Sequence, residues 1–210
     1  IVINPKTGEV LALASKPDFD PSNSSLIKKW TELVESDNAT LLSRATSGLY
    51  PPGSTFKIIT AAAAIENNLD GEEYSDTGSV TIGGATFSNY GKKAYGQIDF
   101  GKAFALSSNY VFCKLGAALT SAVLRGTATR FGFDKSFDFD IDFSKSTFSK
   151  KDTDEAGSAA LAIGQGEILA TPLQMALCAC AIANEGIIMS PYIVQKATNK
   201  NGMPVYEKKP

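Results

Sequence analysis

The sequence predicts an α+β (α/β) protein, and three observations indicate this fold class. Strand-like segments joined by turn residues occur near both ends of the chain, whereas the middle is dominated by helical patterns. The 210 residues are 43% hydrophobic and 20% charged, which is enough to bury the core of one domain. No internal repeat or long linker divides the chain, so we expect a single domain.

The N-terminal part is expected to form a hairpin followed by a short helix. The segments IVIN and EVLALAS flank the turn sequence Pro5-Lys6-Thr7-Gly8, a pattern typical of a β-hairpin. Residues 16–24 are predicted to be a loop, and residues 25–35 an amphipathic helix. The apolar side of that helix consists of Leu26, Ile27, Trp30, Leu33 and Val34.

The middle of the chain is predicted to be mainly helical. Residues 54–69 are Ala-rich and apolar at nearly every position, which is typical of a buried helix. Residues 70–96 are rich in Gly, Ser and Tyr and contain short strand-like pieces such as SVTIGG and ATFSNYG. Three further helices are then expected, at about 99–106, 108–119 and 121–131.

Residues 134–155 alternate Phe or Ile with Asp and then become rich in Ser and Lys, so we predict a solvated loop or edge strand. The spacing of Asp138, Asp140 and Asp142 resembles the start of a calcium loop. The sixth position of that loop would be Phe143 instead of Gly, and the twelfth Ser149 instead of Glu. We therefore expect no metal here.

The C-terminal part is predicted to hold a helix and a second hairpin. Thr171 suits the N-cap and Pro172 the first helical position, and the helix is expected to run to Asn184. Gly186 stands where a C-cap belongs. The dipeptide Asn-Gly at 201–202 lies between PYIVQKAT and MPVYEKKP, which indicates a hairpin.

Composition excludes several function classes. The chain contains no histidine, which removes Ser-His-Asp and Cys-His catalysis and every histidine-based metal site. Its formal net charge of −2 gives no reason to expect a nucleic acid partner. The three cysteines, Cys113, Cys178 and Cys180, show no metal or disulfide spacing and are expected to be free thiols. No cofactor is expected.

The stretch Tyr50-Pro51-Pro52-Gly53-Ser54-Thr55-Phe56-Lys57 carries the most chemistry. Residues three apart share a helix face, so Ser54 and Lys57 can touch. A lysine among apolar neighbours loses solvation, its pKa falls, and it can then act as a base near neutral pH. The N-terminus of a helix also favours negative charge near Ser54. This arrangement suits an activated serine nucleophile, although the residues alone leave a structural role open.

Short patterns of this kind also arise by chance. A second S-x-x-K occurs at Ser25–Lys28, on an amphipathic helix where lysine is expected to stay solvated. The pattern S-x-N occurs at Ser36–Asn38, which suits cap and turn chemistry, and at Ser107–Asn109, between two predicted helices. Considered without further context, Ser107 is better explained as a helix cap.

The motifs together resemble a family. YPPGSTFK, LSSNYVF, AIGQGEILATPLQMA and IANEG occur in the order of the transpeptidase domain of penicillin-binding proteins, and NPKTGEVLALASKPDFDP resembles the strand with which that domain begins. The resemblance covers most of the chain and is closest to the monofunctional, class B-like type. It implies an antiparallel sheet flanked by helices, with an all-helical lobe that contributes the cleft from residues about 54–131.

The resemblance also implies roles for four residues. Ser54 would be the nucleophile that attacks the D-Ala-D-Ala carbonyl of a peptidoglycan stem peptide, and Lys57 its base. Ser107 would relay a proton to the leaving D-Ala nitrogen, and Asn109 would bind the substrate backbone and orient Lys57. A β-lactam would acylate Ser54 in place of the peptide. Membrane proteins of cell division or elongation are possible partners.

The family's third motif is missing from its expected place. The only K-T-G, Lys6-Thr7-Gly8, precedes all the other motifs and is interpreted as a turn. We therefore expect residues 1–210 to be a transpeptidase domain that is incomplete at its C-terminus and inactive without the missing segment. The resemblance places the protein at the outer face of a bacterial cell membrane, anchored by a segment outside this chain.

Two alternatives remain. A D,D-carboxypeptidase or serine β-lactamase on the same scaffold would transfer the acyl group to water, but no residue is identified that would position such a water. A non-enzymatic β-lactam sensor or cell-wall scaffold is the second alternative. A sensor would keep Ser54, Lys57, Ser107 and Asn109, whereas a pseudoenzyme would not need them.

Overall fold

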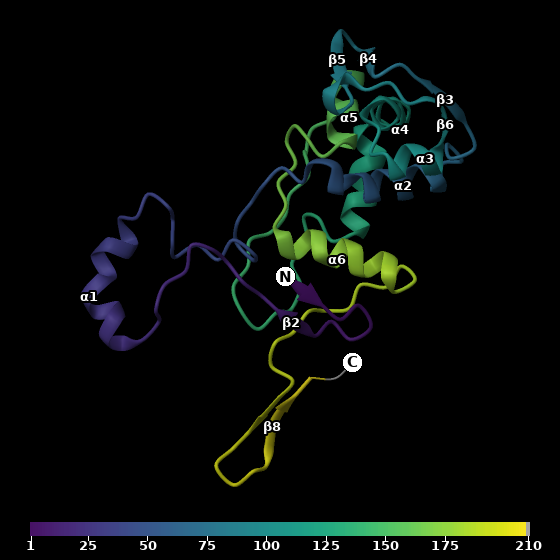
Figure 1. Cartoon of the computed structure of the whole chain (residues 1–210). Coiled ribbons are helices and arrows are strands. Elements are labelled where there is room, and N and C mark those ends of the chain that lie inside the picture. The colour runs from purple at the N-terminus through teal and green to yellow at the C-terminus, as the bar shows by residue number, and fades with distance from the viewer. Residues whose placement is uncertain (209–210) are drawn as a thin grey trace. The chain divides into compact units, whose positions relative to one another are not determined.

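A computed structural model describes residues 1–208 of the chain (Figure 1). The contacts divide the chain into two compact units, and each is described separately. Unit 1 consists of residues 1–49, residues 137–144 and the chain from Thr171 onward. Unit 2 consists of residues 50–136 and 145–170. All four predicted site residues belong to unit 2.

Unit 1 contains two hairpins and two helices. Strand β1 pairs with β2, and β7 with β8, both antiparallel, so both predicted hairpins are confirmed. The turn of the first hairpin contains Lys6-Thr7-Gly8, and Gly8 N–H donates to the carbonyl of Asn4 at 2.9 Å. The bounds are β1 Val2–Ile3, β2 Val10–Ala12, α1 Asn23–Val34, α6 Pro172–Ala183, β7 Lys196–Thr198 and β8 Pro204–Glu207.

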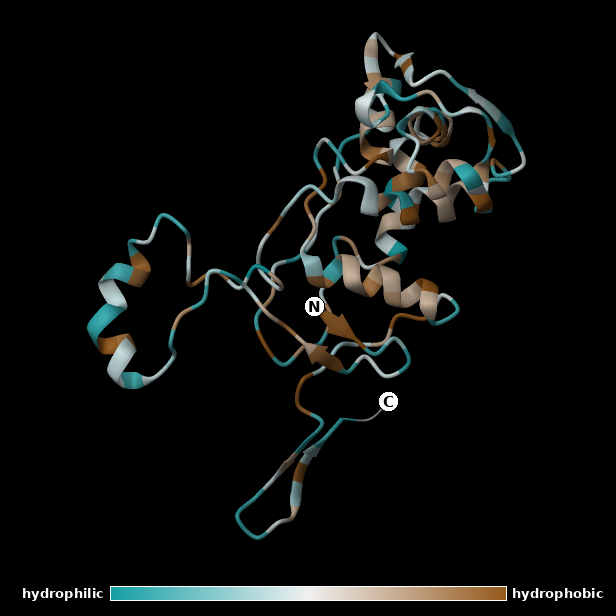
Figure 2. Cartoon of the chain, in the orientation of Figure 1, coloured by the Kyte–Doolittle hydropathy of each residue, from teal (hydrophilic) through white to brown (hydrophobic). Residues whose placement is uncertain are grey.

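Helix α6 begins as its sequence predicts. The Thr171 side chain accepts a hydrogen bond from the backbone N–H of Gln174, and Pro172 occupies the first turn, where no intrahelical N–H is needed. Leu173, Leu177 and Ala181 are buried at four-residue intervals along one face. Figure 2 shows this helix as mainly apolar.

Helix α1 differs from α6 because none of its residues is buried. Three of its apolar residues are exposed, Ile27 by 82%, Trp30 by 54% and Val34 by 57%, and Leu26 and Leu33 are half-buried. Polar and apolar residues alternate along it in Figure 2. The amphipathic helix predicted for residues 25–35 is confirmed, but within the described residues its apolar side does not form part of a core.

Unit 2 is built from helices and two small antiparallel sheets. In one sheet β3 pairs with β6, and in the other β4 pairs with β5. The predicted fold class is confirmed, but "all-helical" is too narrow for the lobe, since these four strands lie within it. The bounds are η1 Gly53–Phe56, α2 Lys57–Glu66, β3 Glu73–Asp76, β4 Ser79–Ile82, β5 Ala85–Ser88, η2 Tyr90–Lys92, β6 Gly96–Asp99, α3 Phe100–Ala105, α4 Asn109–Arg130 and α5 Glu155–Ala162.

Helix α4 forms the centre of unit 2. Its helical geometry breaks at Thr120 (φ 67°, ψ 158°), close to the predicted boundary between helices 108–119 and 121–131. Its Gly116 packs against α5, where an added Cβ would lie 2.4 Å from Ala162 Cβ and 2.7 Å from the carbonyl oxygen of Ser158. Helix α5 itself was not predicted from the sequence.

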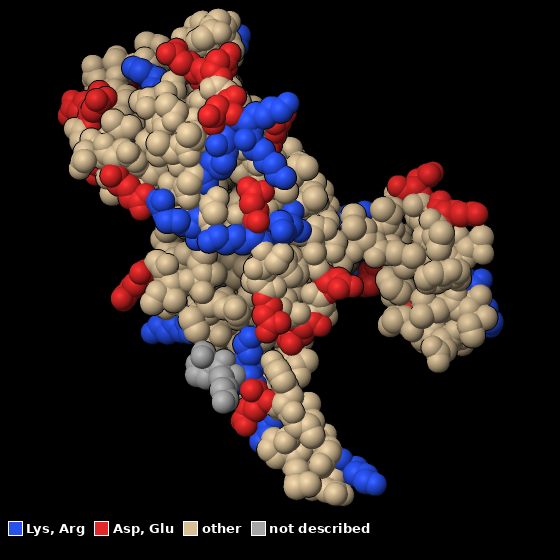
Figure 3. Space-filling model, turned by 180° about the vertical axis from the view of Figure 1, so that it is seen from behind, with Lys and Arg blue, Asp and Glu red and all other residues tan. Residues whose placement is uncertain are grey.

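The region 134–155 is largely without regular structure up to α5, as predicted. The prediction that it is solvated is wrong for Ser146, Phe148 and Ser149, which are at most 3% exposed. Its Asp140 carboxylate accepts hydrogen bonds from the backbone N–H groups of Val194 and Ile193, within unit 1. These bonds lower the pKa of Asp140. Acidic and basic side chains are interspersed on the face of the molecule drawn in Figure 3.

Candidate active site

Ser54 and Lys57 lie on consecutive short helical segments. Ser54 belongs to the short 3₁₀ helix η1, and Lys57 is the first residue of α2. Ser54 is exposed, whereas Lys57 is only 2% exposed. Between them, Phe56 is fully buried and packs edge-on against Phe133, with ring centroids 5.7 Å apart. Phe56 therefore fixes η1 to the core of unit 2 while Ser54 stays accessible.

Three backbone contacts hold the segment before Ser54. Tyr50 and Ala170 exchange two hydrogen bonds, of 3.0 and 2.8 Å, and Gly53 N–H donates to the carbonyl of Gly164 at 3.0 Å. Gly164 has φ +70°, and a Cβ there would lie 2.2 Å from the carbonyl oxygen of Gly53. The approach of these two backbones therefore requires glycine at position 164.

Ser107 and Asn109 occupy the junction between α3 and α4. Ser107 is exposed and has φ +55°, a conformation that residues other than glycine rarely adopt. Asn109 is the first residue of α4, and its Nδ2 donates to the Ser88 carbonyl at 2.8 Å. That bond leaves Oδ1 of Asn109 as an acceptor directed at Lys57.

The Lys57 side chain links these two residues to α2. Its Nζ donates to the Ser107 carbonyl oxygen at 2.7 Å, to Ser107 Oγ at 3.0 Å and to Asn109 Oδ1 at 2.7 Å. A lysine ammonium has three donors, so all three are satisfied in this arrangement. The Nζ also lies 5.4 Å from the centroid of the buried Phe112 ring. The structure therefore brings Lys57, Ser107 and Asn109 together.

Burial lowers the pKa of Lys57 to about 8, from an ordinary value of 10.5. The predicted fall in pKa is confirmed. The nearby Cys113 thiol acts in the opposite direction if ionised. Burial, however, raises the pKa of Cys113 to about 12, so it carries no charge near pH 8 and burial decides the state of Lys57.

Within the described residues, no hydrogen bond joins Ser54 Oγ to Lys57 Nζ. Ser54 lies three residues before Lys57 in the sequence. The hydroxyl that contacts the Lys57 amine is that of Ser107. Catalytic hydrogen bonds in unliganded enzymes are often long and become short only with substrate bound. Ser54 thus presents an exposed hydroxyl three residues before a buried lysine with a lowered pKa, a pair of groups that can supply a nucleophile and its base.

A family model described as "Penicillin binding protein transpeptidase domain" matches residues 1–210. The chain belongs to this family.

Several members of this transpeptidase family are similar to the chain. "Peptidoglycan D,D-transpeptidase PbpA" of Mycolicibacterium smegmatis is 34% identical over 208 residues, which cover 93% of this chain and 42% of the relative. "Stage V sporulation protein D" of Bacillus subtilis is 31% identical over 220 residues, which cover 99% of this chain and 33% of the relative. The chain therefore spans less than half the length of these two curated relatives.

Solved structures confirm the transpeptidase fold. The crystal structure of PBPA from Mycobacterium tuberculosis matches 98% of this chain and 51% of that chain, with a TM-score of 0.91 and 32% sequence identity. Another structure of that protein, an imipenem acyl-enzyme complex, also matches with a TM-score of 0.91 and 32% identity, over 98% of this chain and 50% of that chain.

The cluster around Lys57 includes residues that the sequence did not identify. Phe112 and Cys113 lie next to the Lys57 amine, and the Ser88 carbonyl orients Asn109. Phe112 and Cys113 follow Asn109 on α4 by three and four residues, so helical periodicity could have placed them on the same face. No local pattern indicates Ser88, because its contact depends on how β5 packs against α4.

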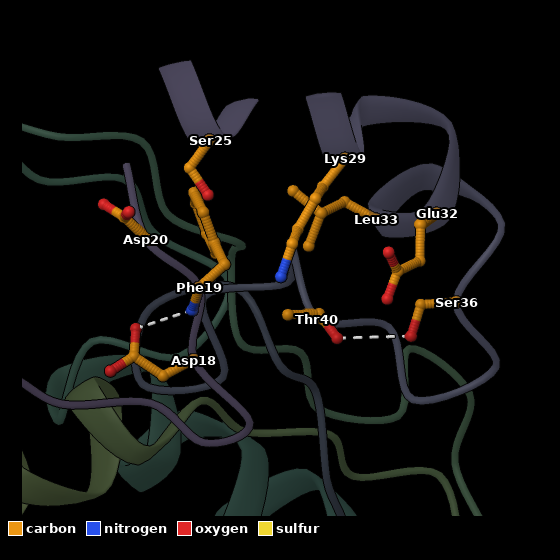
Figure 4. A pocket seen from close by; sticks show the side chains of 9 residues that line it. All are labelled: Asp18, Phe19, Asp20, Ser25, Lys29, Glu32, Leu33, Ser36 and Thr40. Carbon is orange, nitrogen blue, oxygen red and sulfur yellow. Dashed lines mark hydrogen bonds between the residues drawn. The ribbon is translucent and has the colours of Figure 1, made fainter. Parts of the chain in front are cut away.

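Other features of the described residues do not belong to this site. A pocket of about 290 Å³ in unit 1 is lined by residues of α1 and of the loops on either side, including Ser25 and Lys29 (Figure 4). None of the four predicted site residues lines it. In the part of the chain that the structure describes, no helix is long and apolar enough to span a bilayer, and no group of three acidic or cysteine side chains forms a metal site.

Proposed function

We propose that the natural protein carrying this sequence is a D,D-transpeptidase that cross-links peptidoglycan stem peptides through an acyl-enzyme on Ser54. The contacts of Lys57 provide the main support. This lysine is buried, its pKa is lowered to about 8, and it is bonded to both Ser107 and Asn109. A lysine in this state can lose a proton near neutral pH, as a general base must.

In the proposed acylation, Ser54 Oγ attacks the carbonyl carbon of the D-Ala-D-Ala bond and its proton passes to the neutral amine of Lys57. A tetrahedral oxyanion forms and collapses as the C–N bond breaks. The leaving D-Ala nitrogen takes its proton through the Ser107 hydroxyl, which is 3.0 Å from Lys57 Nζ. The proton that Lys57 accepted from Ser54 is thereby delivered to the leaving group, and the amine is neutral again.

In the proposed second step, an amine of a neighbouring stem peptide attacks the Ser54 ester. The same groups act in reverse, since a proton must leave the attacking nitrogen and one must return to Ser54 Oγ. Asn109 has the role of holding Lys57 and contacting the substrate backbone. Its Oδ1 is already bonded to Lys57 and its Nδ2 to Ser88, so contact with substrate requires one of these bonds to be shared or exchanged.

The comparisons support the substrate class. Relatives are named peptidoglycan D,D-transpeptidases, and PBPA of M. tuberculosis has been solved as acyl-enzymes with imipenem and penicillin G. We propose that β-lactams acylate this protein in the same way, and that it works on the outer face of the cell membrane with partners of cell division or elongation. We also propose that a K-T-G element outside residues 1–210 completes the site, because Lys6-Thr7-Gly8 forms a hairpin turn.

Labelling with a fluorescent penicillin tests this function. We expect the natural protein to form an adduct of stoichiometry one that maps to Ser54 by peptide mass analysis. The variant Ser54→Ala should lose the adduct completely, because no other group supplies the nucleophile. Ser25→Ala is the matched control, since Ser25 also lies three residues before a lysine, and its labelling should equal that of the wild type.

A chase with unlabelled penicillin separates the alternatives. A stable adduct supports the transpeptidase, whereas release within seconds indicates transfer to water and a β-lactamase. An adduct combined with peptide turnover that yields only the hydrolysed product indicates a carboxypeptidase. Absence of any adduct on Ser54 in the natural protein would refute the proposed function.

A further inference from the structure

Asp76 is a buried carboxylate that the mechanism above does not use. It is the last residue of β3 and is 1% exposed. Its Oδ1 accepts the backbone N–H of Gly78 at 2.7 Å, and its Oδ2 accepts the Ser108 hydroxyl at 2.6 Å. The Asn89 amide nitrogen donates to both oxygens at 2.9 Å. No cation lies within ion-pair distance of it among the described residues.

All of these partners of Asp76 are hydrogen-bond donors. The Ser108 hydroxyl already accepts a hydrogen bond from the backbone N–H of Val111 at 3.1 Å, so its proton is directed at Asp76. A carboxylate accepts at both oxygens, whereas an amide or a protonated acid presents a donor at one of them. An amide at position 76 would therefore set a donor against a donor in a buried site, which is unfavourable.

The Asp76 carboxylate reaches both sides of the Ser107–Asn109 junction. On one side, Ser108 is fully buried, caps α4 and is bonded directly to Asp76. On the other, the Asn89 side chain is held by Asp76 and accepts the backbone N–H of Tyr110 at 3.1 Å through Oδ1.

This contact also fixes the strand that orients Asn109. Asn89 directly follows Ser88, whose carbonyl accepts Asn109 Nδ2 at 2.8 Å. Asp76 thus sets the position of Asn109 through Asn89 and that of Ser107 through Ser108. Ser107 needs such support because its φ of +55° is strained for a residue with a side chain.

We propose that Asp76 is a positioning residue for acylation: it holds Ser107 and Asn109 against Lys57 through Ser108 and Asn89. The inference rests on the proposed function. It predicts that loss of the Asp76 carboxylate displaces the acceptors of Lys57 by a fraction of an ångström to an ångström. Loss of the carboxylate should slow the chemical step and leave the initial, noncovalent binding of a β-lactam little changed.

The test separates binding from chemistry in the natural protein. Stopped-flow acylation by a chromogenic cephalosporin gives the noncovalent dissociation constant and the acylation rate constant. We expect Asp76→Asn to lower the rate constant by roughly 10²-fold, the size expected for misplacement of about 1 Å. The dissociation constant should change by less than about threefold. Ser108→Ala should lower the rate constant in the same way, by roughly tenfold or more.

Asp154→Ala is the matched structural control. Asp154 caps α5 as Ser108 caps α4, by accepting the backbone N–H of Gly157 at 2.8 Å, and it does not contact the junction. Its loss should lower the melting temperature, by less than Ser108→Ala because Asp154 is exposed, and leave the acylation rate constant unchanged. The double variant Asp76→Asn/Ser108→Ala should be no slower than the slower single variant, because Ser108 acts through its contact with Asp76.

The outcomes distinguish this inference from the proposed function. A wild type that is not acylated on Ser54 refutes the function itself. An acylated wild type together with a folded Asp76→Asn variant of unchanged rate constant refutes only the positioning role, as do strictly multiplicative effects in the double variant. If Asp76→Asn does not fold, Ser108→Ala decides: a lowered rate constant supports the role, and an unchanged one overturns it.

Discussion

The two S-x-x-K segments of this chain have the same spacing and opposite environments. Ser54 precedes Lys57, which is 2% exposed and donates to three acceptors. Ser25 precedes Lys28 on α1, a helix without a single buried residue. In the pocket beside Ser25, the dashed contacts join other groups, Ser36 to Thr40 and Asp18 to Phe19 (Figure 4).

Spacing therefore supplies only proximity, whereas the surroundings of the lysine supply reactivity. A helix brings residues three apart to one face in both cases. Only the Ser54–Lys57 segment starts from a turn that is anchored by Phe56 and Gly164, and only its lysine lies against the Phe112 ring. Desolvation then lowers the pKa of Lys57, whereas the side chain of Lys28 is exposed to solvent.

Replacing each of the two lysines should give the largest difference in acylation rate between the two segments. Lys57→Ala is expected to lower the rate of acylation by a β-lactam by about 10²- to 10⁴-fold, the range for loss of a general base. Lys28→Ala should leave it unchanged, because Lys28 is exposed. The rates are measured by time-resolved labelling, with circular dichroism to show that both variants are folded. Equal rates for Lys57→Ala and the wild type would remove Lys57 from its proposed role.

The pH dependence of acylation reports the same lysine. Only the neutral amine can act as base, so the acylation rate constant should rise about tenfold per pH unit below the pKa and level off above about 8. The rate constant is measured at saturating β-lactam from about pH 5.5 to about pH 9.5, which covers both sides of the Lys57 pKa. The variant Asp154→Ala serves as a control with the same profile. A rate constant that is flat across pH 6 to 9 would contradict a base with this pKa.

Stability should show the linked effect with a defined sign. The pKa of Lys57 is about 8 in the folded protein and 10.5 ordinarily, so between these values the unfolded chain binds a proton that the folded chain has lost. The free energy of unfolding should therefore rise with pH across this window, by about 3 kcal/mol in total. Chemical denaturation of the wild type and Lys57→Met measures it, because their difference isolates Lys57. A difference that does not depend on pH would show that Lys57 is not desolvated.

The elements of this fold that the sequence predicted are those with strong local signals. The cap of α6 at Thr171, both hairpins and the break near Thr120 follow from local backbone preferences. Helix α5 was missed although Asp154 and Glu155 form a usable N-terminal signal, because its Gly and Ser content masks the helical period. The exposure of the apolar side of α1 could not be predicted, since amphipathic periodicity does not show what covers a helix.

For the site, the sequence supplied the reacting residues and not their support. Ser54, Lys57, Ser107 and Asn109 were identified from two motifs and a resemblance, and their roles stay predictions. Asp76 lies 32 residues before Ser108, in a Gly- and Ser-rich stretch without a motif. Its contact with Ser108 arises only when β3 packs beside α4, so no local pattern could reveal it.

Of the two S-x-x-K segments, only that of Ser54 is held by a close contact between two glycines, Gly53 and Gly164. Gly164→Ala places a Cβ 2.2 Å from the Gly53 carbonyl oxygen, in a conformation with φ +70°, so backbone must shift. We expect a loss of about 1–3 kcal/mol in the free energy of unfolding, and slower acylation because Gly53 precedes Ser54. Gly126→Ala is the control: this exposed position within α4 has no atom near the added Cβ, and helix propensity predicts a gain of about 0.5–1 kcal/mol. Denaturant titration and penicillin labelling of both variants measure these effects, and a Gly164→Ala protein as stable and reactive as wild type would show that the Gly53 contact does not hold Ser54.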